Sequence, residues 1–132
     1  MVKYEPAPDI KVAIDDLISK LKMTHIKADY VKCMRSYESK SRAYAHIWSM
    51  SRILQLALDI KPHYIIEVLS EKFDKLSQED KTKVLIHELL HIPKSFSGAL
   101  VNHNCFGNKV INNDKINQLY KEYNLKDLSD FY

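Results

Sequence analysis

The chain has 132 residues, a length typical of one domain. Hydrophobic residues make up 45% of it and charged residues 28%, values that exclude a disordered or fibrous protein. The net charge of +3 is spread among acidic residues and does not by itself indicate a nucleic-acid partner. No stretch approaches the roughly 20 apolar residues of a membrane span, and the N-terminus lacks an apolar signal core. We therefore expect a cytoplasmic protein without a membrane partner, in which residues 1–132 form a single domain.

The first half of the chain is expected to contain a helix followed by strands. Apolar residues recur at helical spacing from Asp9 to Met23. From His25 to Arg35 apolar and polar residues alternate, which predicts a strand, and the change of phase at Val31 indicates a bulge or a change of pairing. A second alternating segment predicts a strand from Ala43 to Trp48.

The second half is expected to contain one more strand and two helices. The segment from Leu54 to Ile60 fits either a strand or a short helix, whereas Tyr64 to Leu69 is β-branched and aromatic enough to be a strand. Ser77 resembles the N-cap of a helix, which Pro93 should end. An irregular polar stretch then precedes a last helix from Asp114 to Tyr123. This order of elements predicts an α+β fold.

The helix expected between Ser77 and Pro93 contains an HExxH pattern formed by His87, Glu88 and His91. Histidines four apart project from one helical face, so both imidazoles can reach one Zn²⁺ at about 2.0–2.1 Å. Glu88 would lie beside the metal, where it can act as general base on the zinc-bound water that serves as nucleophile. The alternative is a helix that carries two surface histidines by chance.

A catalytic zinc usually takes a third protein ligand and keeps one position open. The metzincin pattern would require Gly at position 94 and His at position 97, but the chain has Lys94 and Ser97 there, which excludes that class. Three other histidines lie in or beside the expected strands, where surface positions or satisfied strand positions are more common than ligand positions: His25, His46 and His63.

His103 is the third ligand that we favour among the downstream donors. Gly98 permits a turn, and the segment after His91 is long enough to bring the chain back to the metal. Glu122, on the last helix, is the reserve ligand, and the thiol of Cys105 could compete for the metal. Alternatively, His103 is an ordinary histidine of a surface loop.

The segment Val84–Pro93, VLIHELLHIP, continued by Phe96, Ser97 and Gly98 and ending at His103, resembles the archaeal and phage-type zinc metallopeptidases. Residues 41–70 are also similar to that family, and the resemblance covers roughly residues 40 to 125. It implies a small zincin-like domain. The elements expected from the residues give this domain an N-terminal helix, a three- to four-stranded sheet, the HExxH helix, an irregular loop and a C-terminal helix. The resemblance also implies zinc ligands at both motif histidines and at the later one.

These observations predict a zinc-dependent peptidase that acts on a peptide or protein substrate, with Glu88 as its catalytic residue. One alternative is a non-catalytic zinc-binding regulatory domain, against which the intact Glu88 argues. Another is a protease that acts on DNA-associated proteins, because the ligand spacing is also similar to SprT-type proteases. The residues of the expected elements do not identify the substrate.

Overall fold

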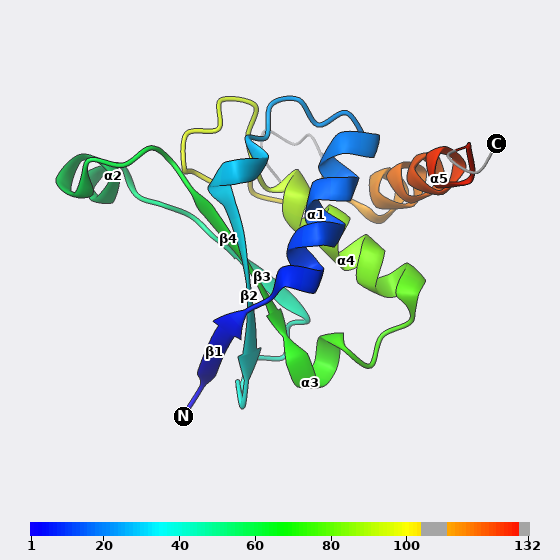
Figure 1. Ribbon diagram of the computed structural model, residues 1–132, viewed down its shortest axis with the longest axis horizontal. Helices are drawn as coiled ribbons and strands as arrows, with labels where there is room; N and C mark the ends of the chain where they lie inside the picture. The colour runs from blue at the N-terminus through cyan, green and yellow to red at the C-terminus, as the bar shows by residue number, and fades with distance from the viewer. Residues whose placement is uncertain (104–110, 130–132) are drawn as a thin grey trace.

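The computed structural model describes residues 1–103 and 111–129, which form an α+β fold around one mixed sheet. Its four strands are β1 (Lys3–Pro6), β2 (Val31–Tyr37), β3 (Ala45–Trp48) and β4 (Tyr64–Leu69), in the order β1-β2-β4-β3. The central strands β2 and β4 are parallel, whereas β1 and β3 pair antiparallel at the two edges (Figure 1). The α+β class and the four-stranded sheet agree with the sequence prediction.

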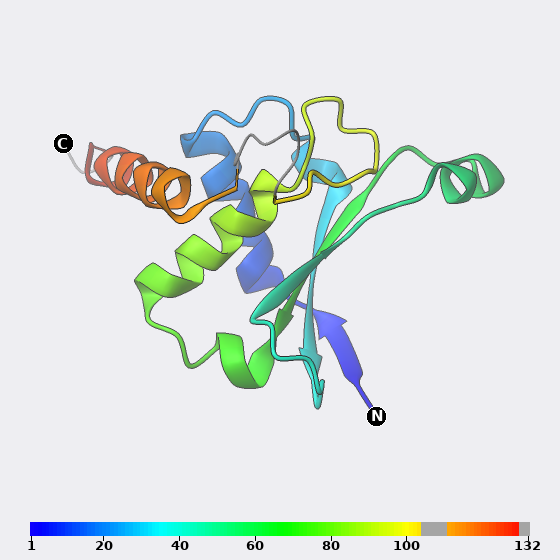
Figure 2. The ribbon, with the colours of Figure 1, turned by 180° about the vertical axis from the view of Figure 1, so that it is seen from behind.

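The longer helices lie together on one side of this sheet. They are α1 (Pro8–Lys20), α4 (Gln78–Leu90) and α5 (Asn113–Ser129), and a short helix α3 (Ser70–Phe73) leads from β4 towards α4. Both ribbon views place α1 and α4 beside the sheet and α5 further out, against the other two (Figures 1 and 2). The remaining helix, α2 (Arg52–Leu58), projects from the body between β3 and β4.

The hydrophobic core fills the space between the sheet and these helices. Fully buried side chains of α1 and α4 meet those of the central strands, among them Ile14, Leu17, Ile86, Leu89, Val31, Ile66 and Val68. The β-branched residues of β2 and β4 suit a parallel pair whose inner face is covered by helices. Burying each such side chain stabilises the fold by about 1.5–3 kcal/mol, so α4 is held firmly against the sheet.

The ends of α4 are fixed by the two local signals expected from the sequence. The Ser77 hydroxyl accepts a hydrogen bond from the Asp80 amide at 3.1 Å, as an N-cap should. The helix then stops at Leu90, with His91 as its C-cap, just before Pro93. These two signals therefore set the position of the HExxH residues on the last turn and a half of the helix.

Two parts of the prediction for His25 to Arg35 need correction. The alternation from His25 to Tyr30 is not a strand, because Met23 and Ile26 are buried in a turn after α1 and Ala28–Tyr30 forms a 3-10 turn. Since β2 begins at Val31, the change of phase there marks a strand start and not a bulge.

The segment from Leu54 to Ile60, for which both readings were open, contains the helix α2, which Ser51 caps by accepting from the Leu54 amide. The sequence did not predict β1 or α3, both only four residues long. The last helix extends from Asn113 to Ser129, beyond the predicted end at Tyr123. No helix in the described part of the chain has the length and apolar character needed to cross a membrane.

Candidate metal centre

Three histidine side chains converge at the C-terminal end of α4. The Nε2 atom of His87 lies 3.4 Å from Nε2 of His91 and 3.1 Å from Nε2 of His103. Two nitrogens bound at about 2.05 Å to one tetrahedral metal ion would be about 3.3 Å apart. The three ligand atoms all lie within 4.8 Å of one another, so the group could hold one metal ion.

The tautomer of His91 is fixed by a hydrogen bond on the far side of its ring. Its Nδ1 lies 2.6 Å from the carbonyl oxygen of Val101, which can only accept, so Nδ1 carries the proton and donates it. The neutral ring therefore presents the lone pair of Nε2 to the other histidines. A backbone carbonyl is a common outer partner of a metal-binding imidazole, because it orients the ring and raises its basicity.

Burial favours the neutral form of the helical histidines. Burial first, and then the neighbouring His91 and His103, lower the pKa of His87 to about 4. The pKa of His91 is also lowered, chiefly by burial. A metal binds the neutral imidazole, so at neutral pH no proton has to leave these two rings before a metal ion can bind.

Glu88 is buried beside the histidines, with only 7% of its surface exposed. Burial raises the pKa of its carboxyl to about 7, because a charged carboxylate is poorly solvated there. A general base works best with a pKa near the operating pH, so this carboxyl is suited to take and return a proton. It is not one of the three converging donors and stays available for that role.

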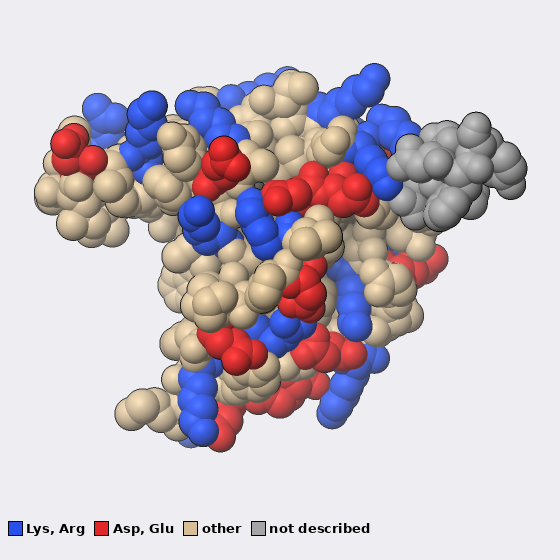
Figure 3. All heavy atoms as spheres, viewed as in Figure 1, with Lys and Arg blue, Asp and Glu red and all other residues tan. Residues whose placement is uncertain are grey.

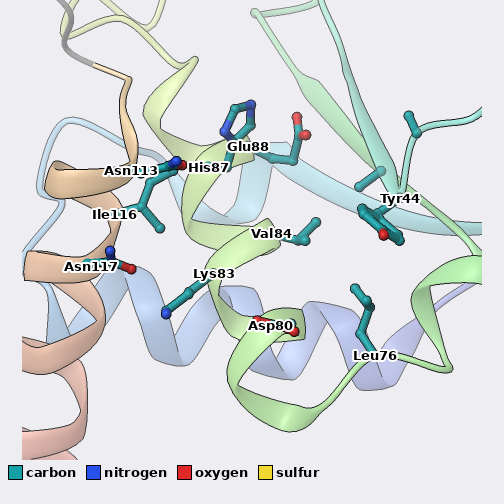
Figure 4. A pocket seen from close by; sticks show the side chains of 12 residues that line it. Tyr44, Leu76, Asp80, Lys83, Val84, His87, Glu88, Asn113, Ile116 and Asn117 are labelled. Atoms are coloured by element: carbon teal, nitrogen blue, oxygen red, sulfur yellow. The ribbon is translucent and has the colours of Figure 1, made fainter.

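A cavity of about 600 Å³ opens beside His87 and Glu88. Figure 4 shows these two residues at one end of it, with Asn113, Ile116 and Asn117 of α5 on one side and Tyr44 and Leu76 on the other. Val84 of α4 forms part of the floor between them. The walls combine apolar side chains with polar ones such as Asp80 and Lys83, and the cavity reaches the edge strand β3 at Ala45, with Ala43 just before it.

The loop after α4 is held in place by residues from distant segments. The Met50 amide donates to the Gly98 carbonyl, and the Gly98 amide donates to the Tyr64 hydroxyl, both at 2.8 Å. The same hydroxyl donates to the Ala99 carbonyl at 2.8 Å, and Nε2 of Gln55 donates to the Met50 and Ser97 carbonyls at 2.9 Å. We call this set, in which Met50, Gln55 and Tyr64 hold residues 97–99, the Gly98 clasp.

Only glycine fits at the centre of the Gly98 clasp. Gly98 has φ +95°, a backbone conformation that other residues rarely adopt. A Cβ atom there would lie 2.4 Å from both Gln55 Nε2 and the Met50 carbonyl oxygen, which is too close for any real contact. The prediction that Gly98 permits a turn is confirmed, and the close approach of the clasp gives a second reason for this residue.

The structure brings together the predicted residues His87, Glu88, His91 and His103. Glu122, the reserve ligand, is not in the histidine group and lies exposed on α5, where it accepts from Gln118. Cys105 lies outside the described residues. The other histidines contact polar groups away from the histidine group: His25 the Ile92 carbonyl, His46 the Ser41 hydroxyl and His63 the Lys61 carbonyl.

Sequence reasoning missed the residues that position the loop, namely Gln55, Tyr64 and Val101. A glutamine between Leu54 and Leu56 is a weak sign of a buried polar contact, because apolar helices seldom carry one without reason. No signal marked the Tyr64 hydroxyl or the Val101 carbonyl, since their partners lie 34 and 10 residues away in the sequence.

A protein-family model matches most of the chain. The model described as "Putative phage metallopeptidase" matches residues 2–124. The chain belongs to this family. The match includes the N-terminal helix, which lay outside the resemblance recognised from the sequence. No curated protein and no solved structure matches the chain. Membership of this phage metallopeptidase family supports a metal-dependent peptidase.

Proposed function

We propose that the protein is a zinc peptidase in which His87, His91 and His103 bind the metal and Glu88 is the general base. The observation that carries the proposal is the convergence of three imidazole nitrogens at tetrahedral spacing beside a buried carboxyl. Among the described residues the group offers three nitrogen donors, the number typical of catalytic zinc, whereas structural zinc sites are closed by four protein ligands. This geometry is the support for placing the active site of the peptidase at the HExxH residues.

The peptide substrate is expected to lie along the edge strand β3. The Leu69 amide donates to the Tyr44 carbonyl, so Tyr44 and Leu69 form a hydrogen-bonded pair of the antiparallel ladder. Because such pairs alternate, the amides and carbonyls of Ala45 and Ile47 point away from β4, towards the open edge. An extended peptide can add to this edge through main-chain hydrogen bonds, as in other β-augmentation complexes.

This edge leads the substrate to the catalytic group. Ala43 and Ala45 line the same cavity as His87 and Glu88, so a peptide on β3 passes directly in front of α4. The apolar side chains of Val84, Leu76 and Ile116 would contact an apolar side chain next to the bond to be cleaved. Backbone contacts along β3 would then position the peptide, and the cavity would select its side chain.

The chemistry divides between the metal and the chain. A bound zinc ion supplies Lewis acidity, lowering the pKa of water towards ~7 and polarising the scissile carbonyl. Glu88 takes the proton of the attacking water and returns it to the nitrogen of the leaving amine. The Val101 carbonyl keeps His91 in the tautomer that binds metal.

Cleavage of casein by wild type and by Glu88→Gln at equal zinc content tests this function. The amide replaces a group that does not bind the metal, so zinc should be retained while turnover falls about 10²–10⁴-fold. His63→Ala, which changes a histidine outside the group, is the matched control and should keep both properties. Equal, non-zero activity in Glu88→Gln and wild type would exclude Glu88 as the base. Full zinc occupancy without any cleavage in either protein would favour the regulatory alternative.

A further inference from the structure

The cavity beside the metal centre extends along α4 towards the start of this helix. Three of its lining residues follow one another at intervals of four on α4: Asp80, Val84 and Glu88. Because a helix rises about 1.5 Å per residue, Asp80 lies about 12 Å from Glu88 along the helix axis. Figure 4 shows Glu88 near one end of the cavity, Asp80 near the other and Val84 between them. The cavity therefore has the proposed general base at one end and a second carboxylate at the other.

The Asp80 carboxylate is exposed and has no partner among the described residues. Within residues 1–103 and 111–129 it forms neither a hydrogen bond nor an ion pair. The Asp80 amide, and not the carboxylate, donates to the Ser77 hydroxyl that caps α4. The first turn of α4 therefore keeps its cap without this carboxylate, which is available to bind a cation in the cavity.

Lys83 is the one lysine or arginine among the described residues that line the cavity, and its charge is already engaged. Its Nζ lies 3.2 Å from the Glu79 carboxylate and 5.2 Å from the centre of the Tyr120 ring. In Figure 4 the Lys83 side chain points towards α5, away from Asp80. The charge that this end of the cavity offers to a substrate is therefore negative.

Aliphatic side chains from three segments also line the cavity: Leu76, Val84 and Ile116. A substrate side chain that enters from β3 meets these aliphatic groups on its way to Asp80. Lysine and arginine carry a charge at the end of three or four methylene groups, and they pack this stem on apolar surface while the charge stays in a polar environment. A purely apolar side chain would contact the aliphatic groups but leave the Asp80 carboxylate without a partner.

A preference for a cationic residue has to arise inside the cavity. The chain carries a net charge of +3, which does not attract a cation at long range. On the face drawn in Figure 3, basic and acidic side chains are interspersed, and no large area carries one sign. The Asp80 carboxylate is thus the local feature that would distinguish lysine from an uncharged residue of similar length.

We propose that the cavity selects a lysine or arginine next to the bond to be cleaved, and that Asp80 determines this specificity. The proposal rests on the proposed peptidase function, because that function places the substrate along β3. The methylene stem of the cationic residue contacts the aliphatic side chains, and its ammonium or guanidinium group forms a hydrogen-bonded ion pair with the Asp80 carboxylate. An uncharged residue of the same length gains the first contact and not the second.

Cleavage of two short peptides that differ in one charge tests the proposal. One carries a single lysine, and the other carries acetyllysine, which keeps the stem and loses the charge. The wild type should cleave the lysine peptide with a kcat/KM about tenfold or more above that of the acetyllysine peptide, the effect expected of a hydrogen bond to a charged group. Asp80→Asn should bring this ratio close to one. A wild-type ratio near one, or an unchanged ratio in Asp80→Asn, would overturn the proposal.

Asp114→Asn is the matched control for the charge change. Asp114 is also an exposed acidic residue in the first turn of a helix, but it does not line the cavity. This variant should keep the wild-type ratio, and a ratio near one here as well would contradict a specific role of Asp80. Circular dichroism checks that α4 stays folded in Asp80→Asn.

Peptide binding to zinc-loaded Glu88→Gln measures the same preference without turnover. Fluorescence anisotropy should show about tenfold tighter binding of the labelled lysine peptide, and equal binding of both peptides once Asp80→Asn is added. The two proposals can therefore fail separately. Equal activity of Glu88→Gln and wild type would exclude the catalytic role of Glu88 and leave this preference measurable. Equal or absent binding of the two peptides to Glu88→Gln would overturn the role of Asp80 even in an active peptidase.

Discussion

The two halves of the candidate metal centre are built in different ways. His87, Glu88 and His91 lie on one helix, whose start and end are set by residues within the same segment. His103 lies on a loop, which takes its position from the Gly98 clasp and from Val101. The helical half therefore depends on local signals and core packing, and the loop half depends on long-range hydrogen bonds. Changes to one half should be distinguishable from changes to the other.

Removal of a histidine ligand should have the largest effect on zinc affinity. The size of the loss should differ between the helical half and the loop half. His87→Ala should lower zinc affinity by more than the roughly 100-fold limit of outer-sphere changes, because His87 Nε2 is the nitrogen nearest to both others. His103→Ala should retain more affinity, since the helical pair stays intact. Competition with a chromophoric chelator measures both constants. Full zinc occupancy in His87→Ala would rule out the proposed centre, and equal losses would mean that the halves are equivalent.

The helical half should show a pH signature in the metal-free protein. Burial raises the pKa of Glu88 from 4.5 to about 7, so the folded state binds more protons than the unfolded state in that window. The contribution of Glu88 to folding stability therefore falls by up to about 3 kcal/mol as pH rises from 4.5 to 7. His87, with its pKa lowered from 6.5 to about 4, acts with the opposite sign between these values.

Comparison with Glu88→Gln isolates the contribution of Glu88. The stability difference between this variant and the wild type should grow in favour of the variant as pH rises from 4.5 to 7. Urea unfolding of chelator-treated protein at several pH values measures it. A loop variant such as Gly98→Ala should give a profile parallel to wild type. A constant difference between Glu88→Gln and wild type would show that the carboxyl is not desolvated.

Gly98→Ala should damage the loop half while the helical half stays folded. The added Cβ would collide with Gln55 and with the Met50 carbonyl, and the backbone would be strained at φ +95°. We expect zinc affinity to fall about 10–100-fold, the usual effect of losing an outer support. Ser95→Ala, an exposed change in the same loop, is the control. Unchanged affinity in Gly98→Ala would show that the clasp does not position His103.

Tyr64→Phe should have the smallest effect, because it removes one hydroxyl and keeps the buried ring. The Gly98 amide and the Ala99 carbonyl would lose their partner, which costs about 1–3 kcal/mol of unfolding free energy when such groups stay buried. Zinc affinity should fall by less than in Gly98→Ala. Thermal unfolding with and without zinc separates the two effects. A variant as stable as wild type would mean that water replaces the hydroxyl.

The helical half could be predicted from the sequence because its signals are local. Ser77 and Pro93 set the helix, and the spacing of the two motif histidines puts them on one face. His103 was selected by chain length and by the resemblance, while the contacts that place it remained invisible. The hydroxyl of Tyr64 and the amide of Gln55 act on residues 34 and 42 positions away, and no periodicity records such pairs.

The errors in the fold have a similar cause. Alternation from His25 to Tyr30 satisfied the pattern of a strand, but Met23 and Ile26 reach the core from a turn. The strand β1 is too short to show a pattern and exists because β2 offers it an edge to pair with. The helix α2 has apolar residues at consecutive positions and is exposed on most of its surface. Its sequence therefore lacks the single apolar stripe that would reveal a helical period.

The double link between His91 and Val101 has a consequence for metal capture. The Val101 amide donates to the His91 carbonyl at 2.7 Å, and the His91 ring donates back to the Val101 carbonyl. Only Asn102 separates this staple from His103, so the third imidazole can explore no more than about 7 Å of chain. Its effective concentration near an ion already held by the helical pair should thus approach the millimolar range or higher, as for two sites joined by a very short linker. The third bond would then form as an intramolecular chelation step, at a rate independent of how much protein is present.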